Sequence, residues 1–209
     1  MSKLTSYKKL VRDYPILTKQ MTKKRLEIIL RELSLVLEAE VPGDIAEFGC
    51  YSGTTSLFIS RLLVRNEEPR TLHVYDSFSG LPPKSIEDAS VAGSDFKAGE
   101  LKASKRDLIK NYKKANLKLP IIHKGWFSEL KDKEIPETIA FAFLDGDFYA
   151  SIIDSLTHVW PRLSEKGVIV IDDFGKSNLP GVSRAVGDFF KDKEVKLQHE
   201  HDLAIIKKL

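Results

Sequence analysis

Four aspartates follow two apolar segments of the sequence, and their types and spacing suit chemistry that uses oxygen ligands. Asp145 and Asp147 come directly after the segment FAFL, and Asp172 and Asp173 end the segment GVIVIDD. If both segments are neighbouring strands, Asp145, Asp172 and Asp173 share one crevice, where three carboxylates repel one another unless a cation lies between them. Oxygen ligands suit a hard divalent cation such as Mg²⁺, or alternatively Ca²⁺ or Mn²⁺. The other interpretation is that these acids are solvated caps of a helix or loop.

A second candidate site is the turn in the segment EFGCYSGTTS, where Gly49 and Gly53 lie between an expected strand and an expected helix. Glycines let the backbone approach a ligand closely, and a helix N-terminus offers free N–H groups. The spacing differs from the dinucleotide fingerprint G-x-G-x-x-G, so a simple turn is the alternative. Asp76 ends the next strand, where a carboxylate can accept both hydroxyls of a ribose, unless it only caps a turn. Together the loop and Asp76 predict an adenosine-containing cofactor.

Alternating strand and helix signals must position these residues. Apolar residues recur at helical spacing from Thr22 to Glu40, with Thr22 as N-cap, whereas the first 20 residues are expected to be irregular. The expected strands are DIAEFG, TLHVYD, LPIIHKG, TIAFAFLD and GVIVIDD, and the later helices are GTTSLFISRLL, SKRDLIKNYKKANL, residues 150–163 and GVSRAVGDFFKD. The last residues read as a hairpin with its turn near Glu200 to Asp202. This order predicts an α/β fold, with a mainly parallel doubly wound sheet and helices on both faces. Ligands then bind beyond the carboxyl ends of the strands.

Composition limits the class of protein. The chain has 209 residues, of which 42% are apolar and 30% charged, as expected for one soluble globular domain. No apolar run approaches the roughly 20 residues that span a bilayer, and the N-terminus lacks an export signal. Cys50 is the only cysteine, so no intrachain disulfide can form. We therefore expect a cytoplasmic protein without a membrane span.

The charge pattern argues against a nucleic-acid partner. The net charge is +3 and the isoelectric point about 8.8, but lysines are interleaved with acids along the chain. A nucleic-acid binder usually gathers its positive charge on one face or arm. The densest basic runs are TKKR at Thr22–Arg25 and KNYKKANLK at Lys110–Lys118. Both are interpreted as solvated helix faces, with contact to an anionic substrate as the alternative.

Several motifs together resemble one family. EFGCYSG, YDSFSGLPP, KGWFSEL, LDGDFYASIIDSLTHVWPRLSEKGVIVIDDF and PGVSRAV occur in the same order as in the macrocin O-methyltransferase family. The resemblance extends from about Thr22 to the C-terminus. It implies an S-adenosylmethionine-dependent enzyme that methylates a sugar hydroxyl. It also implies the class I, Rossmann-like methyltransferase fold, with a seven-stranded sheet that ends in an antiparallel hairpin.

The resemblance also implies a role for each matching residue. The first cofactor loop would comprise Glu47, Phe48, Gly49, Tyr51 and Gly53. Asp76 and Ser77 resemble the ribose-binding corner, Gly125 and Trp126 the segment beside the adenine, and Asp145 also lies next to the cofactor. Asp145, Asp172 and Asp173 match the metal-binding carboxylates, and Asp147 matches the general base. In this mechanism Mg²⁺ lowers the pKa of the acceptor hydroxyl, and Asp147 takes its proton.

The expected organisation is an N-terminal arm at 1–21 and a single methyltransferase domain at 22–209. Residues 77–103 form a long polar segment that is expected to be a lid or substrate loop. The first loop carries CYSGTT where family members commonly have a bulky or basic residue and a second glycine, so its shape is expected to differ. The acceptor is a small molecule or a glycan, and assembly as a homo-oligomer stays open.

Three alternatives compete with a sugar methyltransferase. A catechol-type O-methyltransferase would use the same carboxylates, and only an acceptor screen separates the two. A nucleotide-cofactor oxidoreductase is disfavoured because the chain lacks G-x-G-x-x-G in the first loop and ends in a hairpin. A binding module without catalysis would not need four clustered acids.

Overall fold

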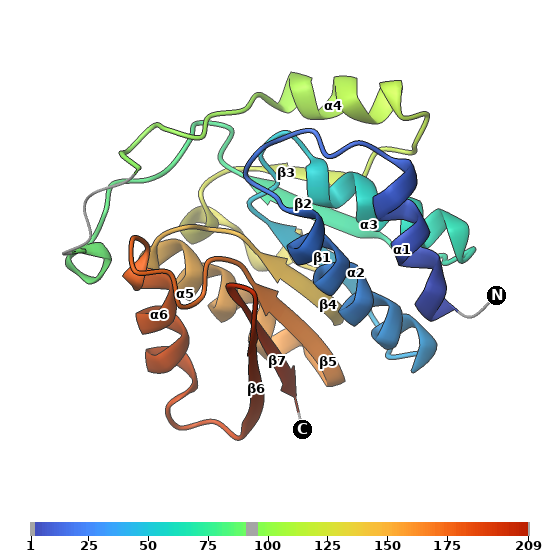
Figure 1. Ribbon diagram of the computed structural model, residues 1–209. Helices are drawn as coiled ribbons and strands as arrows, with labels where there is room; N and C mark the ends of the chain where they lie inside the picture. The colour runs from blue at the N-terminus through green and yellow to red at the C-terminus, as the bar shows by residue number, and fades with distance from the viewer. Residues whose placement is uncertain (1–2, 91–95, 209) are drawn as a thin grey trace.

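The computed structural model describes the backbone of residues 3–90 and 96–208, and side chains from residue 7 onward. Its centre is a seven-stranded sheet with the strand order β3-β2-β1-β4-β5-β7-β6 (Figure 1). The strands are β1 (Asp44–Phe48), β2 (Leu72–Asp76), β3 (Ile121–Lys124), β4 (Ile139–Leu144), β5 (Leu163–Ile171), β6 (Val195–Glu200) and β7 (Leu203–Lys208). Neighbours from β3 to β5 pair in parallel, and β7 is antiparallel to both β5 and β6. The expected α/β fold with a terminal hairpin is confirmed.

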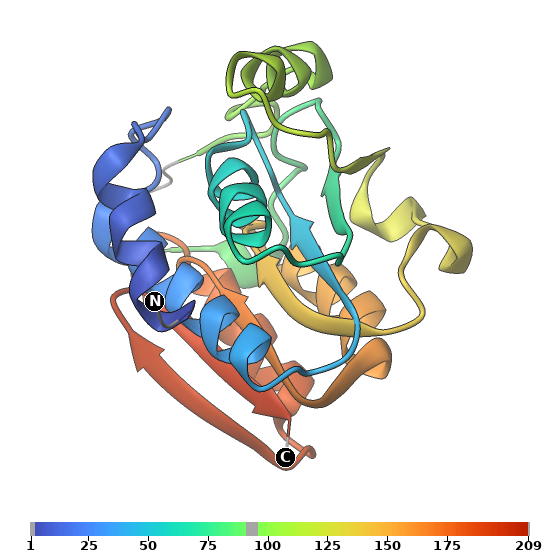
Figure 2. The ribbon, with the colours of Figure 1, turned by 90° about the vertical axis from the view of Figure 1, so that its right-hand side faces the viewer.

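Helices cover both faces of the sheet. One face carries α1 (Lys3–Asp13), α2 (Lys23–Glu38) and α3 (Thr54–Arg65), and the other carries α5 (Tyr149–Val159) and α6 (Pro180–Phe190). Figure 1 shows the two layers on opposite sides of the sheet, and Figure 2 views the molecule from the side of α1, α2 and α3. Phe141 and Phe143 of β4 belong to the first layer, whereas Ala142 and Leu144 belong to the second. This period of two explains why β4 reads as an unbroken apolar run, since a central parallel strand is buried on both faces.

The segments that follow the strands complete the chain. Helix α4 (Lys105–Lys114) lies beside α3 and buries Leu108 and Tyr112. Short 3₁₀ turns occur at Ile86–Asp88, Phe127–Glu129, Asp132–Glu134 and Trp160–Arg162. No helix within residues 3–90 and 96–208 is long and apolar enough to cross a membrane.

The expectation of an irregular N-terminus is wrong. Residues Lys3–Asp13 form α1, and its side chains Tyr7, Leu10 and Val11 are buried in the same core as α2 and α3. These three residues make less than two turns of apolar stripe, which is too short to predict a stable isolated helix. Packing against α2 supplies the missing stabilisation. Helix α1 therefore packs into the core of the domain through Tyr7, Leu10 and Val11.

Other boundaries agree closely with the expected ones. Helix α2 begins after Thr22, whose hydroxyl accepts a hydrogen bond from Arg25 N at 3.2 Å, as expected for an N-cap. The hairpin turns between Glu200 and Leu203, where His201 and Asp202 both have positive φ. Strand β5 begins at Leu163, earlier than expected, because the helical segment ends in the 3₁₀ turn at Trp160–Arg162.

Candidate active site

A cavity opens at the carboxyl ends of β1, β2, β4 and β5. Its empty volume, including open solvent at its mouth, is about 1150 Å³. Ten of the predicted site residues line it: Glu47, Gly49, Tyr51, Asp76, Ser77, Trp126, Asp145, Asp147, Asp172 and Asp173. The sheet order brings them together, because β1 and β4 are neighbours at the point where the chain changes direction across the sheet.

Three predicted cofactor residues lie behind the cavity wall. Phe48 is fully buried and stacks on Tyr75, with ring centroids 4.3 Å apart. Gly53 precedes α3 in a left-handed conformation, and Gly125 N donates to Asp76 O. These three residues do not line the cavity. They contribute to the site through the course of the backbone around it.

The first loop is held against β4 by a very close backbone approach. Gly49 has φ +87°, and a Cβ atom there would lie 1.9 Å from the carbonyl oxygen of Asp145. Gly49 N donates to Tyr75 O, and Asp145 N donates to Phe48 O, both at 2.8 Å. Only glycine fits this position, because both the conformation and the space exclude a side chain. The loop and the acidic cluster are therefore parts of one rigid unit.

Several buried polar atoms around this loop lack a protein partner. Glu47 is 1% exposed, and its Oε2 has no hydrogen-bond partner among the described residues. The same holds, within that part of the chain, for the hydroxyls of Ser52 and Thr54. Burial raises the pKa of Glu47 from its ordinary value of 4.5 to about 8. Buried polar groups are normally satisfied, so this set fits a polar ligand in the loop.

Asp76 shapes the first loop directly. Its Oδ2 accepts from Cys50 N at 3.1 Å and Tyr51 N at 2.9 Å, and its Oδ1 accepts from Phe78 N at 2.7 Å. Burial raises the pKa of this carboxyl, and the three backbone donors oppose that rise. Asp76 can therefore hold the turn together and also contact a ribose, because its carboxylate lines the cavity.

The acidic cluster occupies the other end of the cavity. Asp145, Asp147 and Asp173 each offer a carboxylate oxygen, and these atoms lie within 4.8 Å of one another. Asp147 and Asp173 both adopt φ +60°, which turns the chain so that they face Asp145. Burial, followed by the neighbouring carboxylates, raises the pKa of Asp145 well above its ordinary value and that of Asp147 to about 8. The donor set fits a hard divalent cation.

Asp172 differs from the other three acids. Its Oδ1 accepts from Arg25 at 2.8 Å and from Asp173 N at 3.0 Å. Burial and then Asp173 raise its pKa to about 7, and Arg25 opposes the rise. The three carboxylates that lie closest together therefore include Asp147 and not Asp172. The metal ligands expected from the sequence include Asp172 and not Asp147. Both sets share Asp145 and Asp173.

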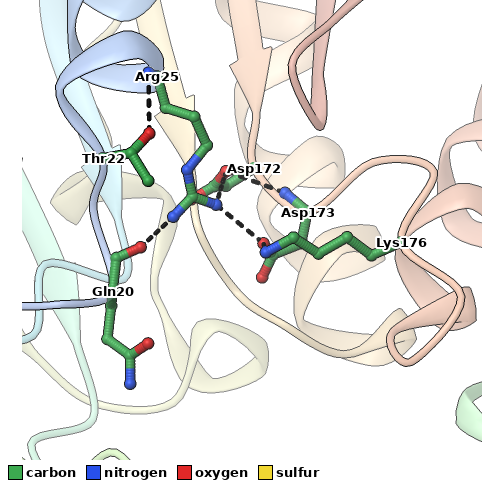
Figure 3. A network of polar contacts seen from close by, with 6 residues as sticks. All are labelled: Gln20, Thr22, Arg25, Asp172, Asp173 and Lys176. Atoms are coloured by element: carbon green, nitrogen blue, oxygen red, sulfur yellow. Dashed lines mark hydrogen bonds and ion pairs between the residues drawn. The ribbon is translucent and has the colours of Figure 1, made fainter.

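Two cationic side chains at this end were missed by the sequence analysis. Arg25 of α2 contacts Asp172 and Asp173, and Lys176 contacts Asp173 (Figure 3). Interpreting TKKR as wholly solvated is wrong, because Lys23 and Lys24 are exposed but Arg25 is 7% exposed. The available signal was its position: Arg25 lies four residues before Ile29, on the apolar stripe of the helix. In the second basic run, Lys110, Lys113, Lys114 and Lys118 are exposed as expected.

The described part of the long loop borders the cavity. Gly80, Leu81, Pro82, Phe96 and Leu101 line it, and the role of residues 77–103 as a lid or substrate loop stays a prediction. Asp88 anchors this loop, since it is buried and accepts from Tyr149 N, the first residue of α5, at 2.8 Å. Residues 91–95 of the expected lid lie outside the described residues.

The raised pKa of Glu47 predicts a specific pH dependence of folding. Between 4.5 and about 8 the folded carboxyl keeps a proton that the unfolded chain releases, so its contribution to stability falls as the pH rises through this window. The variant Glu47→Gln has no ionisable group at this position, so it does not lose this stability as the pH rises. From about pH 5 to about pH 8, the variant should gain about 3.5 kcal/mol in unfolding free energy relative to wild type.

Urea unfolding of both proteins across this range, without added metal or cofactor, measures the effect. The other buried acids contribute equally to both proteins, so the difference isolates Glu47. Parallel stability profiles would show that Glu47 ionises normally in the folded chain.

Comparisons with known proteins agree with this geometry. The sequence profile of the macrocin-O-methyltransferase (TylF) family matches residues 3–203. Mycinamicin III 3''-O-methyltransferase of Micromonospora griseorubida is 30% identical over 187 residues, which cover 85% of this chain and 72% of the relative. Demethyldecarbamoylnovobiocin O-methyltransferase of Streptomyces niveus is 29% identical over 165 residues, which cover 72% of this chain and 60% of the relative.

A third relative comes from Streptomyces olivaceus and is named 8-demethyl-8-(2,3-dimethoxy-alpha-L-rhamnosyl)-tetracenomycin-C 4'-O-methyltransferase. It is 30% identical over 171 residues, which cover 78% of this chain and 65% of the relative. The matched region thus spans less than two thirds of the length of the Streptomyces niveus and Streptomyces olivaceus relatives.

Solved structures give the same result for the fold. The O-methyltransferase NovP superimposes with a TM-score of 0.80 at 26% identity, covering 95% of this chain and 85% of NovP. The calicheamicin methyltransferase CalS11 superimposes with a TM-score of 0.72 at 18% identity, covering 98% and 91% of the two chains, and supports the fold alone. The profile match, the aligned relatives and the shared fold show that this chain belongs to the macrocin-O-methyltransferase family.

Proposed function

We propose that this protein is an S-adenosylmethionine-dependent O-methyltransferase that uses a divalent cation to methylate a hydroxyl of a sugar or glycosylated acceptor. One observation carries the proposal. A single cavity joins a glycine loop with unpaired buried polar atoms to a cluster of carboxylates. The first end suits a cofactor, and the second suits a cation and an acceptor. The relatives are named O-methyltransferases, and one name includes a rhamnosyl group.

The residues present fit the cofactor. S-adenosylmethionine carries a positive sulfonium and a positive amino group, and Glu47 and Asp76 give this end of the cavity acidic walls. We assign Glu47, Gly49 and Tyr51, with the backbone of Phe48 and Gly53, to the first cofactor loop. Asp76 and Ser77 would contact the ribose, and Gly125, Trp126 and Asp145 would complete the site. When bound, the cofactor supplies an electrophilic methyl group.

The residues also fit a cation. We assign Asp145, Asp172 and Asp173 as its ligands, with Mg²⁺ as the expected ion. When bound, a divalent cation lowers the pKa of a hydroxyl beside it. The assignment is supported by the neighbouring ends of β4 and β5, where Asp172 N donates to Leu144 O at 2.9 Å.

Asp147 is the proposed general base. Its carboxylate lies beside Asp145 and Asp173 and lines the cavity, within reach of a hydroxyl held there. Without a cation, burial and the neighbouring carboxylates raise its pKa to about 8. A cation bound beside it would lower this pKa and leave the carboxylate ionised to accept the proton. The rest of the contribution from the protein is alignment, because the methyl donor is already reactive.

The first test is a calorimetric titration of S-adenosylhomocysteine into the purified protein with Mg²⁺, with NAD as the control ligand. We expect binding of S-adenosylhomocysteine and none of NAD. Binding of NAD alone would favour an oxidoreductase, and binding of neither would contradict the cofactor assignment. A screen of glycosides against catechols, with labelled S-adenosylmethionine, then separates the sugar from the catechol acceptor class.

A further inference from the structure

Arg25 lies inside the acidic end of the cavity although it belongs to a distant part of the chain. Its Nη1 donates to Asp172 Oδ1 at 2.8 Å and to Asp173 Oδ1 at 3.1 Å. Its Nη2 donates to the carbonyl oxygen of Gln20, in the segment that leads into α2. Figure 3 shows the guanidinium reaching from the start of α2 toward both aspartates. The helix thus delivers a fixed positive charge to carboxylates that follow β5.

A second arginine on the same helix shows what a purely structural ion pair looks like here. Arg31 donates from Nε to Glu32 and from both Nη atoms to Glu200, and it does not line the cavity. Arg25 is more deeply buried, yet its Nε has no partner within the part of the chain that the structure describes. Arg25 therefore lacks the complete set of hydrogen bonds that Arg31 comes closer to. Its position follows the carboxylates that it faces, Asp172 and Asp173.

Charge counting for the cation-bound state indicates what Arg25 does there. When a bound cation keeps all four acids ionised, Asp145, Asp147, Asp172 and Asp173 carry four negative charges, and Arg25 and Lys176 carry two positive charges. The two negative charges that remain would be balanced by one divalent cation. Lys176 is attached to Asp173 from the following loop and is 29% exposed at its side chain, whereas Arg25 is almost fully enclosed. Arg25 is therefore the less easily displaced of the two.

We propose that Arg25 is a resident counter-ion that weakens divalent-cation binding at the acidic cluster and keeps the cluster folded when no cation is bound. This inference rests on the cation site of the proposed function. Arg25 and the cation share Asp172 and Asp173, so each reduces the electrostatic attraction that the other feels. Arg25 is a positioning residue in this scheme, because it acts on the cation through these ligands.

The test compares the affinity for Mn²⁺ of wild type, Arg25→Met, Arg25→Gln and Arg25→Lys, measured from the electron paramagnetic resonance signal of free Mn²⁺. Removing the nearby positive charge in the Met and Gln variants should tighten Mn²⁺ binding about tenfold. The Lys variant keeps the charge and should bind like wild type. Arg31→Met is the matched control on the same helix, and its Mn²⁺ affinity should be unchanged.

Thermal unfolding gives a readout that is independent of activity. In EDTA, Arg25→Met and Arg25→Gln should melt at lower temperature than wild type, and Mn²⁺ should raise their melting temperature more than that of wild type. If Arg25→Met does not fold in EDTA, folding upon addition of Mn²⁺ supports the inference. If it does not fold in either condition, the comparison of Arg25→Gln with Arg25→Lys decides.

The outcomes separate this inference from the proposed function. If wild type binds Mn²⁺ and the Met and Gln variants bind it equally or more weakly, Arg25 is not a competing counter-ion and the inference is overturned. If no variant binds Mn²⁺, the cation site itself is wrong and the inference falls with it, while binding of S-adenosylhomocysteine still tests the cofactor site. Binding by Arg25→Met but not by wild type would support the inference.

Discussion

Replacing Asp147 with Asn should lower the rate of methyl transfer by about 10³-fold and leave the affinity for S-adenosylhomocysteine nearly unchanged. Asparagine has nearly the same shape but cannot accept a proton from the acceptor hydroxyl. The side chain of Asp147 lies at the acidic end of the cavity, and the unpaired polar atoms that fit the cofactor surround the first loop at the other end. The rate is measured with labelled S-adenosylmethionine and the first active acceptor of the screen, and the affinity by calorimetry.

Asp154→Asn is the matched control. Asp154 follows Asp147 in the sequence and lies within α5. It does not line the cavity. The same change of charge there should leave turnover close to that of wild type. If Asp147→Asn retains turnover, Asp147 is not the base.

The same variant also separates a base from a metal ligand. Asp147 belongs to the close trio with Asp145 and Asp173, so geometry alone permits it to contact a cation. Our assignment predicts that Asp147→Asn weakens Mn²⁺ binding only about tenfold, by the loss of one nearby negative charge, whereas Asp172→Asn removes a ligand and loses most of the affinity. The reverse result would exchange the roles of these two aspartates.

Replacing Gly49 with Ala should destabilise the protein by about 3 kcal/mol and abolish measurable cofactor binding. The new Cβ would lie 1.9 Å from the carbonyl oxygen of Asp145 and would require a positive φ at a residue with a side chain. The obstacle is backbone rather than a flexible side chain, so β1 and β4 must move apart at their ends. That movement displaces the cofactor loop and the acidic cluster together.

Urea unfolding measures the loss of stability, and calorimetry with S-adenosylhomocysteine measures the loss of the site. Gly187→Ala in α6 is the control, because a Cβ there meets nothing within 4 Å. It should be neutral or stabilise the helix by up to about 1 kcal/mol. Wild-type stability for Gly49→Ala would show that the two strand ends separate at little cost.

Local patterns in the sequence determined most of the fold. Strands and helices have different apolar periods, and this chain follows them closely from Thr22 to Lys208, so the order of elements and the terminal hairpin were predictable. The positions of Glu47, Asp76, Asp145 and Asp172 at or beside the strand ends follow from the same patterns. Because parallel strands share one carboxyl edge, the sequence also predicted that these acids gather there.

Contacts between distant segments decided the rest. The helix at Lys3–Asp13 depends on packing against α2, and the burial of Arg25 depends on carboxylates more than 140 residues away. Which acids form the closest trio depends on the left-handed turns at Asp147 and Asp173, and no periodicity encodes these turns. The sequence by itself determined which acids reach the site. Only the tertiary structure decided how their charges are paired, because electrostatic partners are set by distance in space and not by distance along the chain.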